Sequence, residues 1–185
     1  IGVTQANPNY VYLVQMKSTD GTFAGLLRST DAGLNFSTQS TSPNIYGYQC
    51  DGSGTASQAS YDLCITVDPL NANTVYVGSI NNWKSTDGGV TWNIVSHWVG
   101  SSFSEPCAAS VHADQHCYEW SPLNGRLYVG HDGGISYTNN GGISWPEITN
   151  NLAITQIYKI GQGATNTNYT LIGCQDNGSA ATTNG

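Results

Sequence analysis

Two histidines and an aspartate alternate in the segment 112–116 (HADQH), at His112, Asp114 and His116. In an extended strand, side chains two residues apart point to the same face, so these three would form a row about 13 Å long. Such a row offers ligands for a substrate. With help from a neighbouring residue, part of it offers ligands for a divalent metal ion, since its two ends are too far apart to hold one ion alone. The alternative is a polar row that faces a central channel and bonds to neighbouring strands.

Two further segments place an acid directly after a predicted strand, 131–134 (HDGG) and 175–178 (QDNG). Asp132 and Asp176 are suited to accepting backbone N–H groups in turns. The competing interpretation is a ligand surface built from loops. The predicted ligand-binding residues are therefore His112, Asp114, His116, His131, Asp132, Gln175 and Asp176.

Hydrolysis of a glycosidic bond requires two carboxyl groups about 5 to 10 Å apart, one of them with a raised pKa. The acids near the motif segments are Asp62, Asp114, Glu119, Asp132 and Asp176, and we take Asp114, Asp132 and Asp176 as the catalytic candidates. Arg28 and Arg126 are the only arginines, too few for the cluster that a sialidase uses. A G-x-S-x-G nucleophile elbow is absent from the sequence. Because the catalytic set is incomplete, we expect binding rather than catalysis.

The composition indicates the fold class and argues against some classes of partner. Charged residues make up 9% of the 185 residues and glycine occurs 22 times, which favours an all-β protein with many turns. The net charge of -7 disfavours nucleic acid and anionic membrane surfaces as partners. No apolar run approaches the roughly 20 residues of a transmembrane helix.

An eight-residue pattern recurs three times. It reads STDAGLNF at 29–36, STDGGVTW at 85–92 and TNNGGISW at 138–145, with starts 56 and 53 residues apart. Each copy predicts a β-hairpin in which Asp or Asn caps a tight turn and glycine adopts a positive φ. We expect the apolar residue and the aromatic two positions later to pack on one face.

Each pattern follows other strand-like segments, such as 75–78 (VYVG) and 127–130 (LYVG). The repeat unit therefore resembles a four-stranded antiparallel blade of a β-propeller. We expect residues 1–185 to form part of one propeller domain, with approximate blades at 1–50, 51–105, 106–155 and a partial one at 156–185. A propeller needs about four to eight blades to close. The chain thus represents three to four blades of a larger propeller.

The pattern resembles the Asp box, S-x-D-G-G-x-x-W, of sialidases, xyloglucanase-type glycoside hydrolases and the sortilin ectodomain. Box residues are structural in those families, a role that the resemblance implies for Ser29, Asp31, Gly33, Phe36, Ser85, Asp87, Gly89, Trp92, Asn140, Gly142 and Trp145. The order of 111–116 (VHADQH), 131–135 (HDGGI) and 175–178 (QDNG) resembles sortilin-like secreted proteins of Bacteroidetes, many exported by the type IX route. The resemblance implies an extracellular or cell-surface location.

Three functions follow as hypotheses. The first is a binding or structural module for a glycan or protein ligand, without a defined cofactor beyond a possible divalent metal ion. The second is a xyloglucanase-like glycoside hydrolase. The third is a building block of a surface filament or adhesin.

Five cysteines occur, at Cys50, Cys64, Cys107, Cys117 and Cys174, without a C-x-x-C pair. This favours disulfides over a zinc ribbon or redox motif. Nearness in sequence suggests the pairs Cys50–Cys64 and Cys107–Cys117, although sequence alone leaves the connectivity open.

Overall fold

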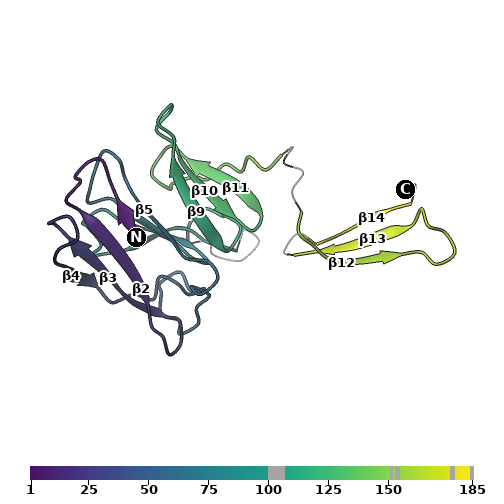
Figure 1. Cartoon of the computed structure of the whole chain (residues 1–185), viewed down its shortest axis with the longest axis horizontal. Helices are drawn as coiled ribbons and strands as arrows, with labels where there is room; N and C mark the ends of the chain where they lie inside the picture. The colour runs from purple at the N-terminus through teal and green to yellow at the C-terminus, as the bar shows by residue number, and fades with distance from the viewer. Residues whose placement is uncertain (100–106, 151, 153–154, 176–177, 184–185) are drawn as a thin grey trace. The chain divides into compact units, whose positions relative to one another are not determined.

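The structure is a computed structural model that describes residues 1–99, 107–150, 152, 155–175 and 178–183. These residues form strands, turns and loops, and no helix occurs among them. The chain divides into two compact units, Ile1–Ile148 and Thr149–Gly185 (Figure 1). In the described residues no helix is long and apolar enough to cross a membrane.

The first unit contains three antiparallel sheets whose strands follow one another in chain order. The first sheet comprises β1 (Gly2–Val3), β2 (Val11–Met16), β3 (Phe23–Ser29) and β4 (Ser37–Ser40). The second comprises β5 (Cys64–Val67), β6 (Val75–Gly78), β7 (Asn82–Ser85) and β8 (Asn93–Ser96). The third comprises β9 (Gln115–Trp120), β10 (Leu127–His131) and β11 (Gly134–Thr138). Each sheet is a β-meander, because turns join strands that are neighbours both in sequence and in the sheet.

The second unit is a three-stranded antiparallel sheet. Its strands are β12 (Ile157–Gln162), β13 (Thr170–Cys174) and β14 (Ser179–Thr182), paired in that order.

Strand β6 explains how the sheets of the first unit stack. Val75 and Val77 belong to a core cluster with Leu26 of the first sheet. Tyr76 lies between them in sequence and belongs to a second cluster with Leu127 and others of the third sheet. Because successive strand residues point to opposite faces, one central strand supplies apolar side chains to both neighbouring sheets. The middle sheet is thereby buried on its two sides.

The three repeated turns share one hydrogen-bond pattern. In the second copy, Ser85 Oγ donates to Asp87 Oδ1 at 2.7 Å and accepts the Gly89 N–H at 2.8 Å. The carboxylate of Asp87 also accepts the N–H groups of Val90 and Thr91. The same two hydroxyl contacts recur from Ser29 to Asp31 and Gly33, and from Thr138 to Asn140 and Gly142.

The expectation that each apolar residue of the pattern packs with its aromatic is wrong. Val90 is 51% exposed, whereas Trp92 is 8% exposed. The segment between them is a turn and not an extended strand, so the period of two does not apply. Trp92 instead reaches the preceding sheet, where its Nε1 donates to Ser40 Oγ at 2.9 Å. Trp145 Nε1 makes the equivalent contact with Val95 O at 3.0 Å.

The disulfide joins Cys50 to Cys107, and the suggested pairs Cys50–Cys64 and Cys107–Cys117 are wrong. Cys64 lies in β5 and Cys117 in β9, and both carry free thiols, as does Cys174. The expectation relied on nearness along the chain. In the fold, the segments that precede the second and third sheets meet, and each carries one half of the disulfide.

Both the backbone conformation at position 89 and the close packing around it require glycine. Its φ is +91°, and an added Cβ would overlap the side chain of the fully buried Leu26. Gly125 has a φ of +67° with no atom within 4 Å of an added Cβ. We expect Gly89→Ala to destabilise the first unit by about 1 to 3 kcal/mol more than Gly125→Ala, since only the former overpacks the core. Urea unfolding followed by tryptophan fluorescence measures both variants, and equal losses would show that the packing term is negligible.

Candidate functional site

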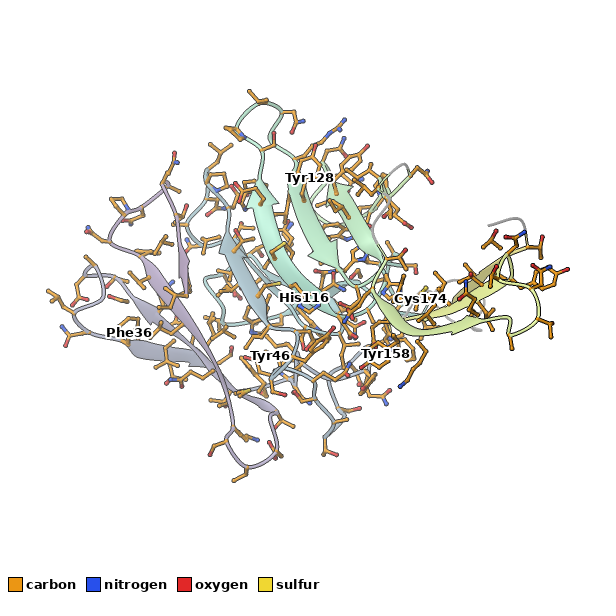
Figure 2. All side chains as sticks on the ribbon, turned by 45° about the vertical axis from the view of Figure 1, so that its right-hand side comes forward. Phe36, Tyr46, His116, Tyr128, Tyr158 and Cys174 are labelled. Atoms are coloured by element: carbon orange, nitrogen blue, oxygen red, sulfur yellow. A yellow bond between two sulfur atoms is a disulfide. The ribbon has the colours of Figure 1, made fainter. Side chains whose placement is uncertain are left out.

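Most of the predicted site residues in the first unit gather where β5 and β9 begin and where β10 turns into β11. Figure 2 labels His116, which lies near the start of β9. Tyr61 and Asp62 come from the segment before β5, and Asp132 from the β10–β11 turn. We call Tyr61, Asp62, His112, Asp114, His116, His131 and Asp132 the histidine–aspartate cluster.

The straight row of His112, Asp114 and His116 does not form. Strand β9 begins only at Gln115, and Asp114 has a φ of 67°. A left-handed residue turns the chain, so the alternation of an extended strand is lost between His112 and His116. The three side chains consequently have different partners, and their role as ligands of a metal or substrate stays a prediction.

A hydrogen-bonded trio at the surface forms one part of the cluster. His116 Nε2 lies 2.6 Å from Asp132 Oδ1, and the Tyr61 hydroxyl donates to Asp132 Oδ2 at 2.9 Å. The Tyr61 ring meets the His116 ring edge to face, with centroids 5.0 Å apart. Tyr61 is 55% exposed and the His116 side chain is 38% exposed, whereas the Asp132 side chain is 11% exposed, so the two rings face solvent and the carboxylate is largely covered.

A pair of carboxyl groups forms the second part, one fully buried and the other half-buried. Asp62 is fully buried and accepts a hydrogen bond from Ser79 Oγ at 3.0 Å, and Asp114 accepts one from Gln58 Nε2 at 3.0 Å. Burial holds the pKa of Asp62 well above its usual range despite the Ser79 bond, and the neighbouring charge of Asp114 raises it further. Among the described residues, Asp62 Oδ2 has no N–H or hydroxyl donor. A proton retained on Asp62 lets the two carboxyl groups share a hydrogen bond.

Two stacked imidazoles form the third part. The rings of His112 and His131 lie 5.8 Å apart at an interplanar angle of 11°. Burial and, to a smaller extent, the nearby His112 together lower the pKa of His131 to about 4. His131 is therefore neutral at pH 7, with Nε2 3.1 Å from the Ser136 hydroxyl.

The remaining predicted residues lie elsewhere or outside the described residues. Glu119 is an exposed residue of β9. Gln175 belongs to the second unit, where its N–H donates to Gln156 O at 2.9 Å. Asp176 lies outside the described residues. Tyr61 and Gln58 were not predicted, because nothing in the sequence relates residues 58 and 61 to partners 56 and 71 positions away.

No family model matches the chain. It is 26% identical over 151 residues to a xyloglucanase of Hypocrea jecorina (strain QM6a), a match that covers 71% of this chain and 17% of that protein. A GH74 xyloglucanase structure from Xanthomonas campestris superimposes with a TM-score of 0.57 at 20% identity, covering 97% of this chain and 28% of that one. An ancestral GH74 enzyme gives a TM-score of 0.50 at 17% identity, covering 93% and 21% of the two chains.

This chain therefore spans less than a third of the length of each of these three proteins. At 20% and 17% identity, the likeness to these structures is evidence for the fold alone. The all-β class and the antiparallel sheets predicted from the sequence are confirmed, and the architecture is that of part of a β-propeller. The first two sheets have the predicted four strands, and the other two have three strands each among the described residues.

Proposed function

We propose that this chain is part of a secreted, carbohydrate-active β-propeller and binds a β-glucan of the xyloglucan kind at the histidine–aspartate cluster. The observation that carries the proposal is the hydrogen-bonded trio of Tyr61, His116 and Asp132, whose two rings face solvent, in a chain that aligns with a xyloglucanase. The four sheets are then successive blades with the boundaries expected from the sequence, and the three repeated turns are Asp boxes.

The chemistry of the trio suits a sugar. A pyranose has hydroxyl groups at its edge and an apolar C–H face. An exposed aromatic ring such as Tyr61 provides a flat apolar surface for that face, and the Asp132 carboxylate can accept sugar hydroxyl groups. Tyr61 and His116 both hold Asp132, so its oxygens are oriented before the ligand arrives.

Affinity measurements with soluble xyloglucan test this proposal. We expect Tyr61→Ala to weaken binding by about tenfold, equivalent to about 1.4 kcal/mol, because it removes the ring and one support of Asp132. Tyr169→Ala is the matched control, since Tyr169 is 50% exposed in the second unit. Isothermal titration calorimetry with both variants gives the comparison. Unchanged affinity in Tyr61→Ala, or recognition of a protein ligand without any glycan, would refute the assignment.

Hydrolysis is the second candidate, favoured by the alignment with a xyloglucanase. The Asp62–Asp114 pair does not itself meet the geometry, because two carboxyl groups in mutual contact leave no room for a glycosidic bond between them. Asp62 is fully buried as well, so it cannot touch a substrate. Asp114 or Asp132 would have to act with a carboxylate outside the pair.

A reducing-end assay on xyloglucan separates hydrolysis from binding. If the chain participates in hydrolysis, Asp114→Asn or Asp132→Asn lowers the rate by about 100-fold or more, the usual contribution of an acid or base. Asp20→Asn is the control, because Asp20 serves a hairpin turn through Thr22. Binding of xyloglucan without release of reducing ends would contradict hydrolysis and support the binding role.

A further inference from the structure

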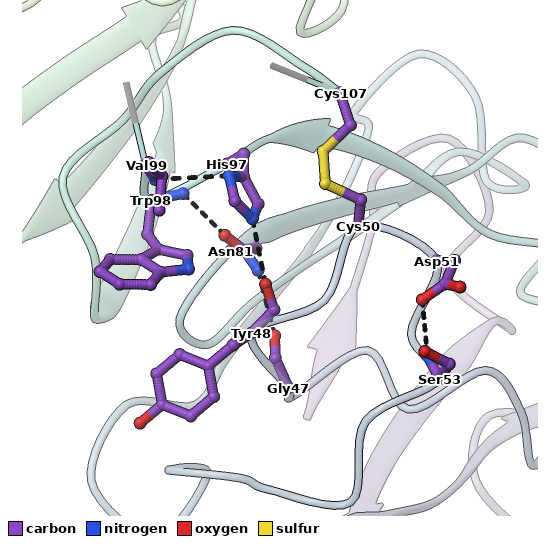
Figure 3. The surroundings of a disulfide bond; sticks show 10 residues. All are labelled: Gly47, Tyr48, Cys50, Asp51, Ser53, Asn81, His97, Trp98, Val99 and Cys107. Carbon is purple, nitrogen blue, oxygen red and sulfur yellow. Dashed lines mark hydrogen bonds between the residues drawn. A yellow bond between two sulfur atoms is a disulfide. The ribbon is translucent and has the colours of Figure 1, made fainter. Parts of the chain in front are cut away.

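A second cluster of metal-binding residue types lies outside the histidine–aspartate cluster. One ligand atom from each of Cys50, His97 and Cys107 lies within 4.8 Å of the others, and this is the only such group of three found among the described residues. In the structure the two sulfurs form a disulfide beside the imidazole (Figure 3). Two sulfurs and one histidine nitrogen form a donor set that zinc prefers, and three protein ligands leave its fourth position for water.

Hydrogen bonds hold the three segments together independently of the S–S bond. The fully buried Asn81 donates to Gly47 O at 3.0 Å and accepts the Trp98 N–H at 2.8 Å, and so links the chain near Cys50 to the chain next to His97 (Figure 3). The His97 N–H donates to Ala109 O at 2.9 Å, which fixes His97 to the segment that carries Cys107. We therefore expect the two cysteines to stay near each other when the disulfide is opened.

The imidazole of His97 is also oriented. Its Nε2 lies 3.0 Å from the Tyr48 carbonyl oxygen, and since a carbonyl only accepts, Nε2 carries the proton. The lone pair is then on Nδ1, which accepts a long hydrogen bond of 3.4 Å from the Val99 N–H, and a metal ion bound at Nδ1 replaces that bond. Histidines that bind metals are commonly held by a carbonyl in this way, because the second bond selects the tautomer.

We propose that Cys50, His97 and Cys107 form a zinc site when the disulfide is reduced. A thiol or phosphine reductant supplies two electrons and is itself oxidised, and the two sulfurs take up two protons. Binding of one Zn²⁺ to the two thiolates and to His97 then releases these protons to solvent. The disulfide and the zinc site are alternative states of one pair of sulfurs, so oxidation expels the metal.

Cobalt and zinc titrations of the reduced protein test the proposal. We expect one Co²⁺ per chain with the intense ultraviolet thiolate-to-metal absorption of a sulfur-ligated ion, displaced by one Zn²⁺. The oxidised protein gives neither signal. His97→Gln keeps both cysteines and the disulfide, and after reduction it is expected to bind zinc at least about tenfold more weakly. A chromophoric chelator that competes for zinc measures the difference.

Matched controls separate this site from the other thiols. Cys117→Ser and Cys174→Ser remove free cysteines outside the cluster and should leave the stoichiometry at one. Circular dichroism establishes that each variant is folded. The proposal is overturned if the folded, reduced protein binds no zinc, if the oxidised protein binds it equally, or if His97→Gln and Cys50→Ser both retain full affinity.

Discussion

Reduction of the Cys50–Cys107 disulfide is expected to lower the free energy of unfolding of the first unit by about 4 kcal/mol. The two cysteines are 57 residues apart, and a cross-link of that span removes much of the freedom of the unfolded chain. The link also connects the segments before the second and third sheets, so it constrains two packed sheets together. Urea unfolding of the protein with and without reductant gives the value directly.

The double variant Cys50→Ser/Cys107→Ser should reproduce the loss without any reductant. Cys117→Ser is the control, because Cys117 is an exposed free thiol in β9. If the double variant unfolds at the same urea concentration as the oxidised protein, the disulfide contributes nothing to stability. Added zinc should recover part of the loss in the reduced protein and none of it in the double variant.

Asp62→Asn is expected to become more stable relative to the natural protein as the pH rises. The pKa of Asp62 is raised in the folded state, so the stability that depends on its proton is complete below the unfolded pKa of about 3.9 and is lost as the pH rises through the folded pKa. Asparagine is neutral at every pH. Its side chain can accept from Ser79 and donate to Asp114. Each unit by which the folded pKa exceeds the unfolded one corresponds to a relative gain of about 1.4 kcal/mol for Asp62→Asn above the folded pKa.

Unfolding free energies of both proteins between pH 4 and pH 8 provide the measurement. His131 affects the same curves with the opposite sign, since its pKa is lowered to about 4. Its contribution is complete above the unfolded pKa of about 6.5 and is lost as the pH falls towards 4. Taking the difference between the two proteins largely cancels the His131 contribution. A difference that does not change with pH would mean that Asp62 is ionised in the folded protein.

Sequence repetition was sufficient to predict the sheets. The repeated turn contains a hydroxyl residue, an acid or amide and glycine at fixed offsets, and these groups bond to one another within a few residues, as Ser85, Asp87 and Gly89 do. Local interactions of this kind depend little on the rest of the chain. The all-β class and the antiparallel order of strands could therefore be predicted from the residues.

The candidate site shows where such prediction ends. His112, Asp114 and His116 were predicted as one row on the assumption of an extended strand, but Asp114 adopts a left-handed conformation. Their partners come from other segments: Gln58 contacts Asp114, and Asp132 contacts His116. No repeat or alternation in the sequence relates these residues to their partners in other segments.

By itself, the sequence determined which turns form and that short antiparallel strands flank them. Only the tertiary structure decided which segments meet when they stack, as for Cys50 with Cys107 and for Asp62 with Asp114. The physical reason is range: turn and strand preferences act over a few residues, whereas the contacts of the site and the disulfide depend on how whole sheets pack.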